Sequence, residues 1–251
     1  MANNIFAGVI ANFLFTVITV IALYILYFIL RRRSLHAFFG VNPHGEVIVY
    51  LSRLEVKPFG ALGAIGEPLA FSGTAVSSHE AAAATKIETL FKVSVPGKAV
   101  QPSWLAWVLV ADVSIRVVPA PTPGEGISFH STVITVGGPA FNIVSRAVQH
   151  DLKAPVGFND KSTNIMLPNL PPVESCSQSF IARIRHNRGF VFYCAGLNQV
   201  TTAAALLYLA TSWQSLHRKY QRTPSFYVLL ESAAHDYSDT RVVAEGPLAM
   251  P

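Results

Sequence analysis

Hydrophobic residues follow three patterns along this chain, and each pattern predicts a different kind of element. An unbroken uncharged stretch occupies Ile5–Leu30. Shorter runs rich in valine, isoleucine and phenylalanine, some of them alternating with polar residues, predict β-strands. These expected strands are Glu46–Val56, the end of Trp104–Val118, Thr132–Val136, Gln178–Arg185, Gly189–Ala195, Ser225–Ser232 and Thr240–Glu245.

Apolar residues spaced three and four positions apart predict the helices. Leu206, Leu209 and Trp213 have this spacing within an expected helix at about Thr201–Lys219. A further helix is expected after Ser77, which forms an S-x-x-E capping box with Glu80. Because strands alternate with helices, the pattern favours an α/β fold built on a mainly parallel, layered sheet.

The uncharged stretch Ile5–Leu30 predicts a single transmembrane helix, since it exceeds the roughly 20 residues needed to cross a bilayer core. A cleaved signal peptide is the alternative, but its apolar region would be shorter and would follow a basic start. Here no Lys or Arg precedes the stretch, and Arg31–Arg33 follow it directly. The positive-inside rule therefore predicts a cell-membrane protein with its N-terminus outside and its C-terminal domain in the cytoplasm.

The predicted organisation has three parts. Residues 1–33 form the transmembrane anchor with its basic stop, residues 34–45 a tether, and residues 46–251 the cytoplasmic α/β domain. Asn12 lies inside the apolar stretch, where its amide could pair with a second copy of the helix and form a homo-oligomer, or could simply be tolerated. Phe38 and Phe39 of the tether are expected to lie at the membrane surface or to tuck under the domain, and a place at the domain edge is favoured.

The central motif of the domain is Ser131–His150, which predicts a buried strand, a glycine turn and a helix. Pro139 suits the first position of that helix, and Phe141, Val144 and Val148 have the spacing of its buried face. Backbone amides in such a turn, together with the positive end of the following helix, can hold an anionic or polar ligand. The same order of strand, small-residue turn and helix recurs around Gly196.

This layout resembles Rossmann-like nucleotide-binding domains from about Glu46 to Glu245, at the level of pattern only. The resemblance implies a nucleotide-like ligand beyond the carboxyl ends of the strands, but no catalytic residue carries over. The residues expected there are Ser52, Arg53, Gly137, Gly138, Asn142, Gly196, Asn198 and Thr201. The asparagines could contact a base, amide or sugar, and Arg53 a phosphate. Alternatively, the glycines serve backbone geometry and the asparagines cap helices.

Composition and motifs argue against several other functions. The net charge is +5, but the basic residues are scattered, which is not the clustered footprint of a nucleic-acid-binding protein. Cys176 and Cys194 lack metal-site spacing and are expected to be free thiols. The chain contains neither G-x-G-x-x-G nor a phosphate loop, so a dinucleotide dehydrogenase or an ATPase has little support, and the cofactor stays undetermined.

Acidic residues at two places in the sequence support the alternative that the chain is an enzyme. Glu80 follows the glycine-rich segment Pro58–Gly73, a possible lid, and could stabilise an oxocarbenium-like state during cleavage of an N-glycosidic bond. The capping box explains Glu80 without chemistry. Glu231, His235 and Asp236 form a second group, which a solvated loop also explains.

The sequence therefore predicts a membrane-anchored sensor or signalling module that binds a nucleotide-like small molecule. The alternatives are an enzyme that cleaves a nucleotide or NAD at the glycosidic bond, and a non-catalytic scaffold at the membrane.

Overall fold

The computed structural model describes residues 2–42, 45–56, 73–91, 113–187, 189–233 and 236–249. The helices are α1 (Ala2–Phe39), α2 (Ser78–Phe91), α4 (Ile143–His150) and α5 (Gln199–Lys219). The strands of the main sheet are β1 (Glu46–Leu51), β4 (Ser114–Pro119), β5 (Thr132–Val136), β8 (Gln178–His186), β9 (Gly189–Gly196), β10 (Phe226–Ala233) and β11 (Asp236–Pro247). Two small hairpins accompany it, β2 (Leu54–Val56) with β3 (Gly73–Ala75), and β6 (Gly157–Phe158) with β7 (Ile165–Met166).

The main sheet has seven strands in the order β11-β10-β8-β9-β5-β1-β4. Strands β4, β1, β5 and β9 pair in parallel, whereas β8, β10 and β11 continue the sheet from β9 by antiparallel pairing. Because β10 is antiparallel to β8, it points the same way as the four parallel strands. The predicted α/β class with a mainly parallel sheet is therefore confirmed, with an antiparallel extension on one side.

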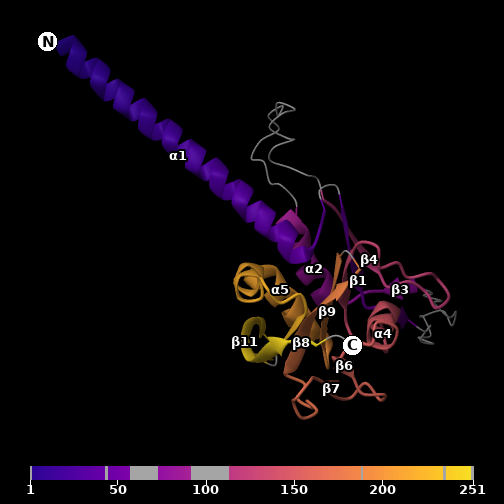
Figure 1. Cartoon of the computed structure of the whole chain (residues 1–251). Coiled ribbons are helices and arrows are strands. Elements are labelled where there is room, and N and C mark those ends of the chain that lie inside the picture. The colour runs from indigo at the N-terminus through magenta and orange to yellow at the C-terminus, as the bar shows by residue number, and fades with distance from the viewer. Residues whose placement is uncertain are drawn as a thin grey trace, which may run out of the picture.

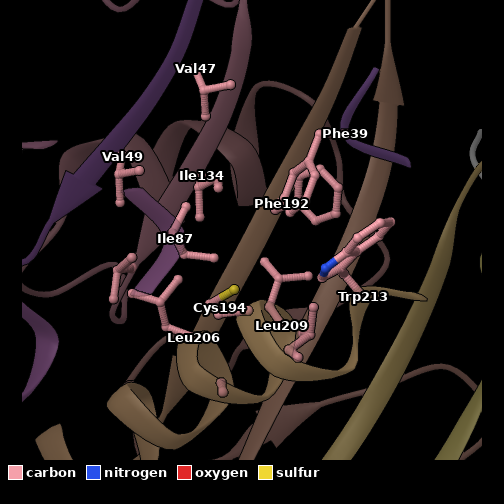
Figure 2. Close-up of a cluster of buried hydrophobic side chains, with 14 of the residues drawn as sticks. Phe39, Val47, Val49, Ile87, Ile134, Phe192, Cys194, Leu206, Leu209 and Trp213 are labelled. Atoms are coloured by element: carbon pink, nitrogen blue, oxygen red, sulfur yellow. The ribbon is translucent and has the colours of Figure 1, made fainter. Parts of the chain in front are cut away.

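The two faces of the sheet bury separate cores. Helices α2 and α5 and the end of α1 cover one face, where Val49, Ile134, Phe192 and Leu206 are buried together (Figure 2). Helix α4 and the segment that carries β6 and β7 cover the other face, around Val133 and Phe180. All five residues of β5 are buried, as expected for a β-branched strand covered on both sides.

Helix α1 projects from the domain as one long rod (Figure 1). It is long and apolar enough, by length and composition, to cross a membrane. The predicted tether is different in the structure, because the helix continues to Phe39 and its last turns enter the core. Phe38 and Phe39 are fully buried, and the Phe38 ring contacts those of Phe192 and Trp213. Burial of these large rings outweighs any preference for the membrane surface.

Arg183 of β8 stabilises the junction between the C-terminal ends of α1 and α5. Its guanidinium donates to the carbonyl oxygens of Phe38 (3.3 Å), Tyr220 (3.2 Å) and Thr223 (2.6 Å), so it joins the C-terminal ends of α1 and α5. The rings of Phe38, Phe190 and Phe226 surround it. Burial lowers the pKa of Arg183 to about 10, which leaves it charged at neutral pH.

Helix α4 begins later than the sequence predicts. Asn142 is its N-cap, and Pro139 lies in the preceding turn instead of at the first helical position. Phe141 is 59% exposed, so its expected place on the buried face is wrong, whereas Val144 and Val148 are buried as expected. The physical reason is the strength of the asparagine cap, whose Oδ1 accepts from the amides of Val144 and Ser145.

The remaining predicted elements can be compared only in part. The hairpin β8–β9, the strand β10 and the edge strand β11 are confirmed. Most of the predicted lid at Pro58–Gly73 and the first half of Trp104–Val118 lie outside the described residues. The predicted helix at Thr201–Lys219 is confirmed as α5, which begins two residues earlier.

Candidate functional site

The central turn requires glycine at its first position. Gly137 has a φ of +97°, and its amide donates to Cys194 O of the neighbouring strand at 2.9 Å. A Cβ at Gly137 would lie 1.9 Å from Ser52 Oγ. Both the left-handed backbone and this close approach exclude a side chain, so the end of β1 packs directly against the turn.

Gly196 ends β9 in a similarly tight place. A Cβ there would lie 2.3 Å from Thr201 Oγ1, within the first turn of α5. Gly138 differs, because its Cβ would meet the ring of Phe158 at an ordinary contact distance of 3.5 Å. Gly137 and Gly196 therefore serve backbone geometry, while Gly138 leaves open space beside the turn.

The turns after β5 and β9 lie at the same edge of the sheet. Val136 pairs with Cys194 in the parallel register, so the two strands end side by side. A cleft of about 140 Å³ opens between the turns and the end of β1. Its lining residues are Ser52, Leu54, Ser77, Glu80, Gly137, Gly138, Ala140, Phe141, Phe158, Ser162, Gly196, Leu197, Asn198, Gln199 and Thr202.

Glu80 places a buried carboxylate in the wall of this cleft. Its side chain accepts a hydrogen bond from Ser52 N at 3.0 Å, and the residue is only 2% exposed. Burial raises the pKa of Glu80, and hydrogen bonds from Ser52 act in the opposite direction. The partner of Glu80 thus lies directly after β1, 28 residues away, rather than in a local capping box. Glu80 connects helix α2 to the tip of the first strand.

Ser77 and Gln199 close the cleft between α2 and α5. Ser77 Oγ donates to Gln199 Oε1 at 3.3 Å, and both residues line the cavity. Thr202, one turn further along α5, contacts Gly196 through its hydroxyl, which accepts from the Gly196 amide at 3.1 Å. The surface of the cleft is mostly apolar, from residues such as Phe158 and Leu197, and its lining also includes hydroxyl, amide and carboxylate groups.

The structure places five of the eight predicted site residues in the cleft lining. They are Ser52, Gly137, Gly138, Gly196 and Asn198. Arg53 and Asn142 instead line a second cavity beside it, and Thr201 lies within the helix cap.

Both predicted asparagines cap helices. Asn142 is buried and donates to Tyr50 O and Val136 O while its Oδ1 caps α4, so every polar atom of its side chain has a partner. Asn198 caps α5 through Thr201 N at 2.9 Å, and its amide donates to Cys176 O at 2.8 Å. Thr201 completes a capping box with Asn198. The alternative that these asparagines cap helices therefore accounts for their hydrogen bonds, and of the two only Asn198 lines the cleft.

Sequence reasoning missed several residues that line the cleft. Thr202 and Gln199 could have been found, because they flank the predicted Thr201 in the first turn of α5. Phe158 could not, since it lies in a proline-containing segment without periodicity that folds back over the turn. Its position depends on Gln149 of α4, whose side chain bonds both the amide and the carbonyl of Phe158.

The other candidate groups are located away from this cleft. Glu231 forms an ion pair with Arg241 across the strands β10 and β11, and His235 lies outside the described residues. Cys176 and Cys194 are free thiols, and burial raises the pKa of Cys194, which packs in the core. Among the described residues, no group of three or more His, Cys, Asp and Glu side chains is placed to hold a metal ion.

Comparison of this chain with protein-family models, with curated proteins and with solved structures finds no match. The site must therefore be interpreted from its own geometry.

Proposed function

We propose that the domain binds a nucleotide-like small molecule in the cleft at the carboxyl edge of β1, β5 and β9, and acts as a membrane-anchored sensor or signalling module. The observation that carries this proposal is the convergence of two strand-to-helix turns on one cleft whose lining includes hydroxyl, amide and carboxylate groups. Ligands of α/β sheets characteristically bind at this edge. The Rossmann-like resemblance adds the nucleotide class to the proposal.

The groups around the cleft favour a neutral, hydroxyl-rich part of a ligand. The Glu80 carboxylate can accept hydrogen bonds from hydroxyl or amino groups of a ligand. The hydroxyl of Thr202 can give up its hydrogen bond with the Gly196 amide and bond a ligand instead. The described residues of the lining include no Lys or Arg. At about 140 Å³ the cleft is smaller than the roughly 300 Å³ at which drug-sized pockets begin, so it suits a sugar or a single ring rather than a whole nucleotide.

The membrane arrangement is part of the same proposal. Helix α1 is proposed to span the cell membrane with its N-terminus outside, because Arg31–Arg33 follow the apolar stretch on the side of the domain. The domain then lies in the cytoplasm, where nucleotides are available, and a second copy could associate through α1 at Asn12. Labelling of single cysteines added at either end of α1 in intact cells tests this orientation.

Binding can be tested with the full chain in detergent micelles. Thermal unfolding would be measured with a panel of nucleosides, nucleotides and phosphorylated sugars, because a ligand that binds only the folded state raises the midpoint. Gly138→Ala narrows the cleft by one methyl group and should weaken binding roughly tenfold, equivalent to about 1.4 kcal/mol. Gly126→Ala is the matched control, because a Cβ there meets nothing within 4 Å.

Two results would contradict binding in this cleft. One is the absence of a shift with every compound in the panel, which would favour a scaffold. The other is an equal shift in wild type and Gly138→Ala.

A second candidate function is hydrolysis of a glycosidic bond, favoured by the burial of Glu80 in the cleft wall. In that reaction the bond between the sugar and the base breaks, water adds its hydroxyl to the anomeric carbon, and the base leaves with the proton. Glu80 would stabilise the positive charge that develops on the sugar. Product analysis with Glu80→Gln separates the two functions, since turnover that is unchanged by the substitution removes Glu80 from the mechanism.

A further inference from the structure

A second cavity adjoins the Glu80 cleft. It has a volume of about 330 Å³ and shares Ala140 and Phe141 with the cleft. Arg53 and Arg146 contribute its positive charge, and Pro139 contributes to its wall. Phe141 is 59% exposed and stands where the two cavities meet. The two cavities thus form neighbouring compartments at one edge of the sheet.

Ser52 and Arg53 each line a different one of these two compartments. They are consecutive residues after β1, and Ser52 lines the cleft while Arg53 lines the second cavity. The Arg53 amide donates to Phe141 O at 2.8 Å, which fixes the tip of β1 to the central turn. The backbone, not the side chain, makes this bond, so the guanidinium of Arg53 is not needed for the connection.

Arg53 has unused hydrogen-bonding capacity. Its Nε is buried and has no hydrogen-bond partner among the described residues. A buried donor without a partner is costly, and a ligand that accepts from it removes that cost. Arg146 is held in place from α4, because its Nε and Nη2 both donate to Pro139 O, at 3.3 and 3.0 Å. Its Nη1 is left to meet a ligand.

The two compartments differ in charge. Among the described residues, the lining of the second cavity has two arginines and no acidic residue, whereas the lining of the cleft has Glu80 and no basic residue. Glu125 is close enough to interact with Arg53, but it is exposed to solvent and accepts a hydrogen bond from Thr122 N. A ligand that matches both compartments carries an anion at one end and neutral hydroxyl or amino groups at the other.

We propose that Arg53 and Arg146 form a phosphate subsite that holds the phosphate of a phosphate ester whose uncharged part occupies the Glu80 cleft. This inference rests on the proposed function and narrows its ligand class to phosphorylated molecules. Two guanidinium groups that line one cavity suit the planar, multidentate hydrogen bonding of a phosphate.

A membrane phospholipid is a poor source for this phosphate. Helix α1 enters the domain at the opposite edge of the sheet, where Phe39 O accepts from Thr132 at the start of β5. The subsite lies beyond the carboxyl ends of the same strands. A soluble phosphate ester reaches it from the aqueous side.

The experiment titrates the full chain in detergent micelles with pyrophosphate, by calorimetry. Arg53→Gln removes the charge with its unpaired donor and should weaken pyrophosphate binding about tenfold to a hundredfold, the usual effect of losing a charged hydrogen bond. Arg218→Gln is the control, since Arg218 is exposed near the other end of α5 and carries the same charge. It should leave binding within about twofold, because surface charges screen at this separation.

A second arm compares each nucleoside with its 5′-monophosphate. The monophosphate should bind more tightly than the nucleoside to wild type, and Arg53→Gln should abolish this preference while keeping nucleoside binding. The same preference in Arg53→Gln, or pyrophosphate binding that Arg53→Gln does not change, overturns the subsite. An equal affinity of nucleoside and monophosphate for wild type also overturns it, yet leaves the proposed function standing. If pyrophosphate binds in an Arg53-dependent way but no nucleoside or nucleotide binds, the subsite alone is supported and its occupant is not a nucleotide.

Vesicles with and without phosphatidic acid, added during the titration, distinguish the lipid source. Competition of these vesicles with pyrophosphate would overturn the assignment to a soluble ester.

Discussion

At the scale of single residues, the partner of a cleft residue can differ from the partner that the local sequence predicts. Glu80 was expected to cap its own helix, and instead it accepts a hydrogen bond from Ser52. A capping box predicts a local partner, but the packing of α2 against the end of β1 supplied a distant one. Periodicity can place Glu80 at a helix start, but it cannot show which strand lies opposite.

The pH dependence of stability should report on Glu80. Its pKa is raised above the ordinary 4.5 in the folded chain, so folding favours the protonated acid. The contribution of Glu80 to the free energy of unfolding is therefore fully present below about pH 4.5 and is lost as pH rises through the folded pKa. Glu80→Gln should flatten this part of the profile, measured by urea unfolding between pH 4 and 8. Glu88→Gln on the same helix is the comparison, and an unchanged slope in Glu80→Gln would show that Glu80 titrates normally.

Gly137 and Gly138 should respond differently to the same substitution. Gly137→Ala combines a positive φ with a Cβ only 1.9 Å from Ser52 Oγ, so it should lower the free energy of unfolding by about 1–3 kcal/mol or more. Gly138→Ala places its Cβ 3.5 Å from Phe158 and should change the free energy of unfolding by less than about 1 kcal/mol. Thermal or denaturant unfolding of both variants checks this, and equal losses would mean that the turn is not in this conformation.

At the scale of elements, the sequence predicts strands and helices better than it predicts where they begin and how they join. The strand β5, the hairpin β8–β9 and the helix α5 follow from local patterns of apolar residues. The start of α4 does not, because Asn142 competes with Pro139 as a helix start and the asparagine cap prevails. The last turns of α1 were also misplaced, since two phenylalanines after a basic stop fit a membrane surface as well as a core.

The junction between α1 and α5 should carry much of the stability. Phe38→Ala removes a fully buried ring that contacts Phe192, Trp213 and Phe226, and should cost about 3–5 kcal/mol. Phe13→Ala is the control on the same helix, because Phe13 is 68% exposed outside the domain. Denaturant unfolding of the full chain in micelles, followed by a probe in the domain, compares them. Similar midpoints for the two variants would contradict the docking of α1.

At the scale of the whole molecule, the end of helix α1 belongs to the core of the domain, because the helix continues to Phe39. The pattern of residues correctly separates an apolar helix from an α/β domain, and places the predicted glycines at one edge of the sheet. It cannot show that Leu35, Phe38 and Phe39 belong to the core of the domain, because that depends on residues distant in sequence, such as the Phe192 and Trp213 that contact Phe38. For the same reason the second cavity, formed by β1, α4 and a proline-rich loop, has no signature in any one segment.

Fragments of different length test whether the domain needs the end of α1 for its stability. A fragment beginning at Ser34 retains the buried end of α1, whereas one beginning at Glu46 leaves the site of Phe38 empty and Arg183 without the Phe38 carbonyl. We expect the longer fragment to unfold cooperatively and the shorter one to unfold at a lower temperature or to aggregate. Equal midpoints would show that the end of α1 is dispensable.

The length of α5 sets how far the cleft lies from the end of α1. The helix has 21 residues, about 30 Å at 1.5 Å per residue, and runs from the cleft to the junction that Arg183 locks onto α1. In the proposed arrangement, the cleft would therefore lie at the end of the domain that faces away from the lipid, and a soluble ligand would reach it through water.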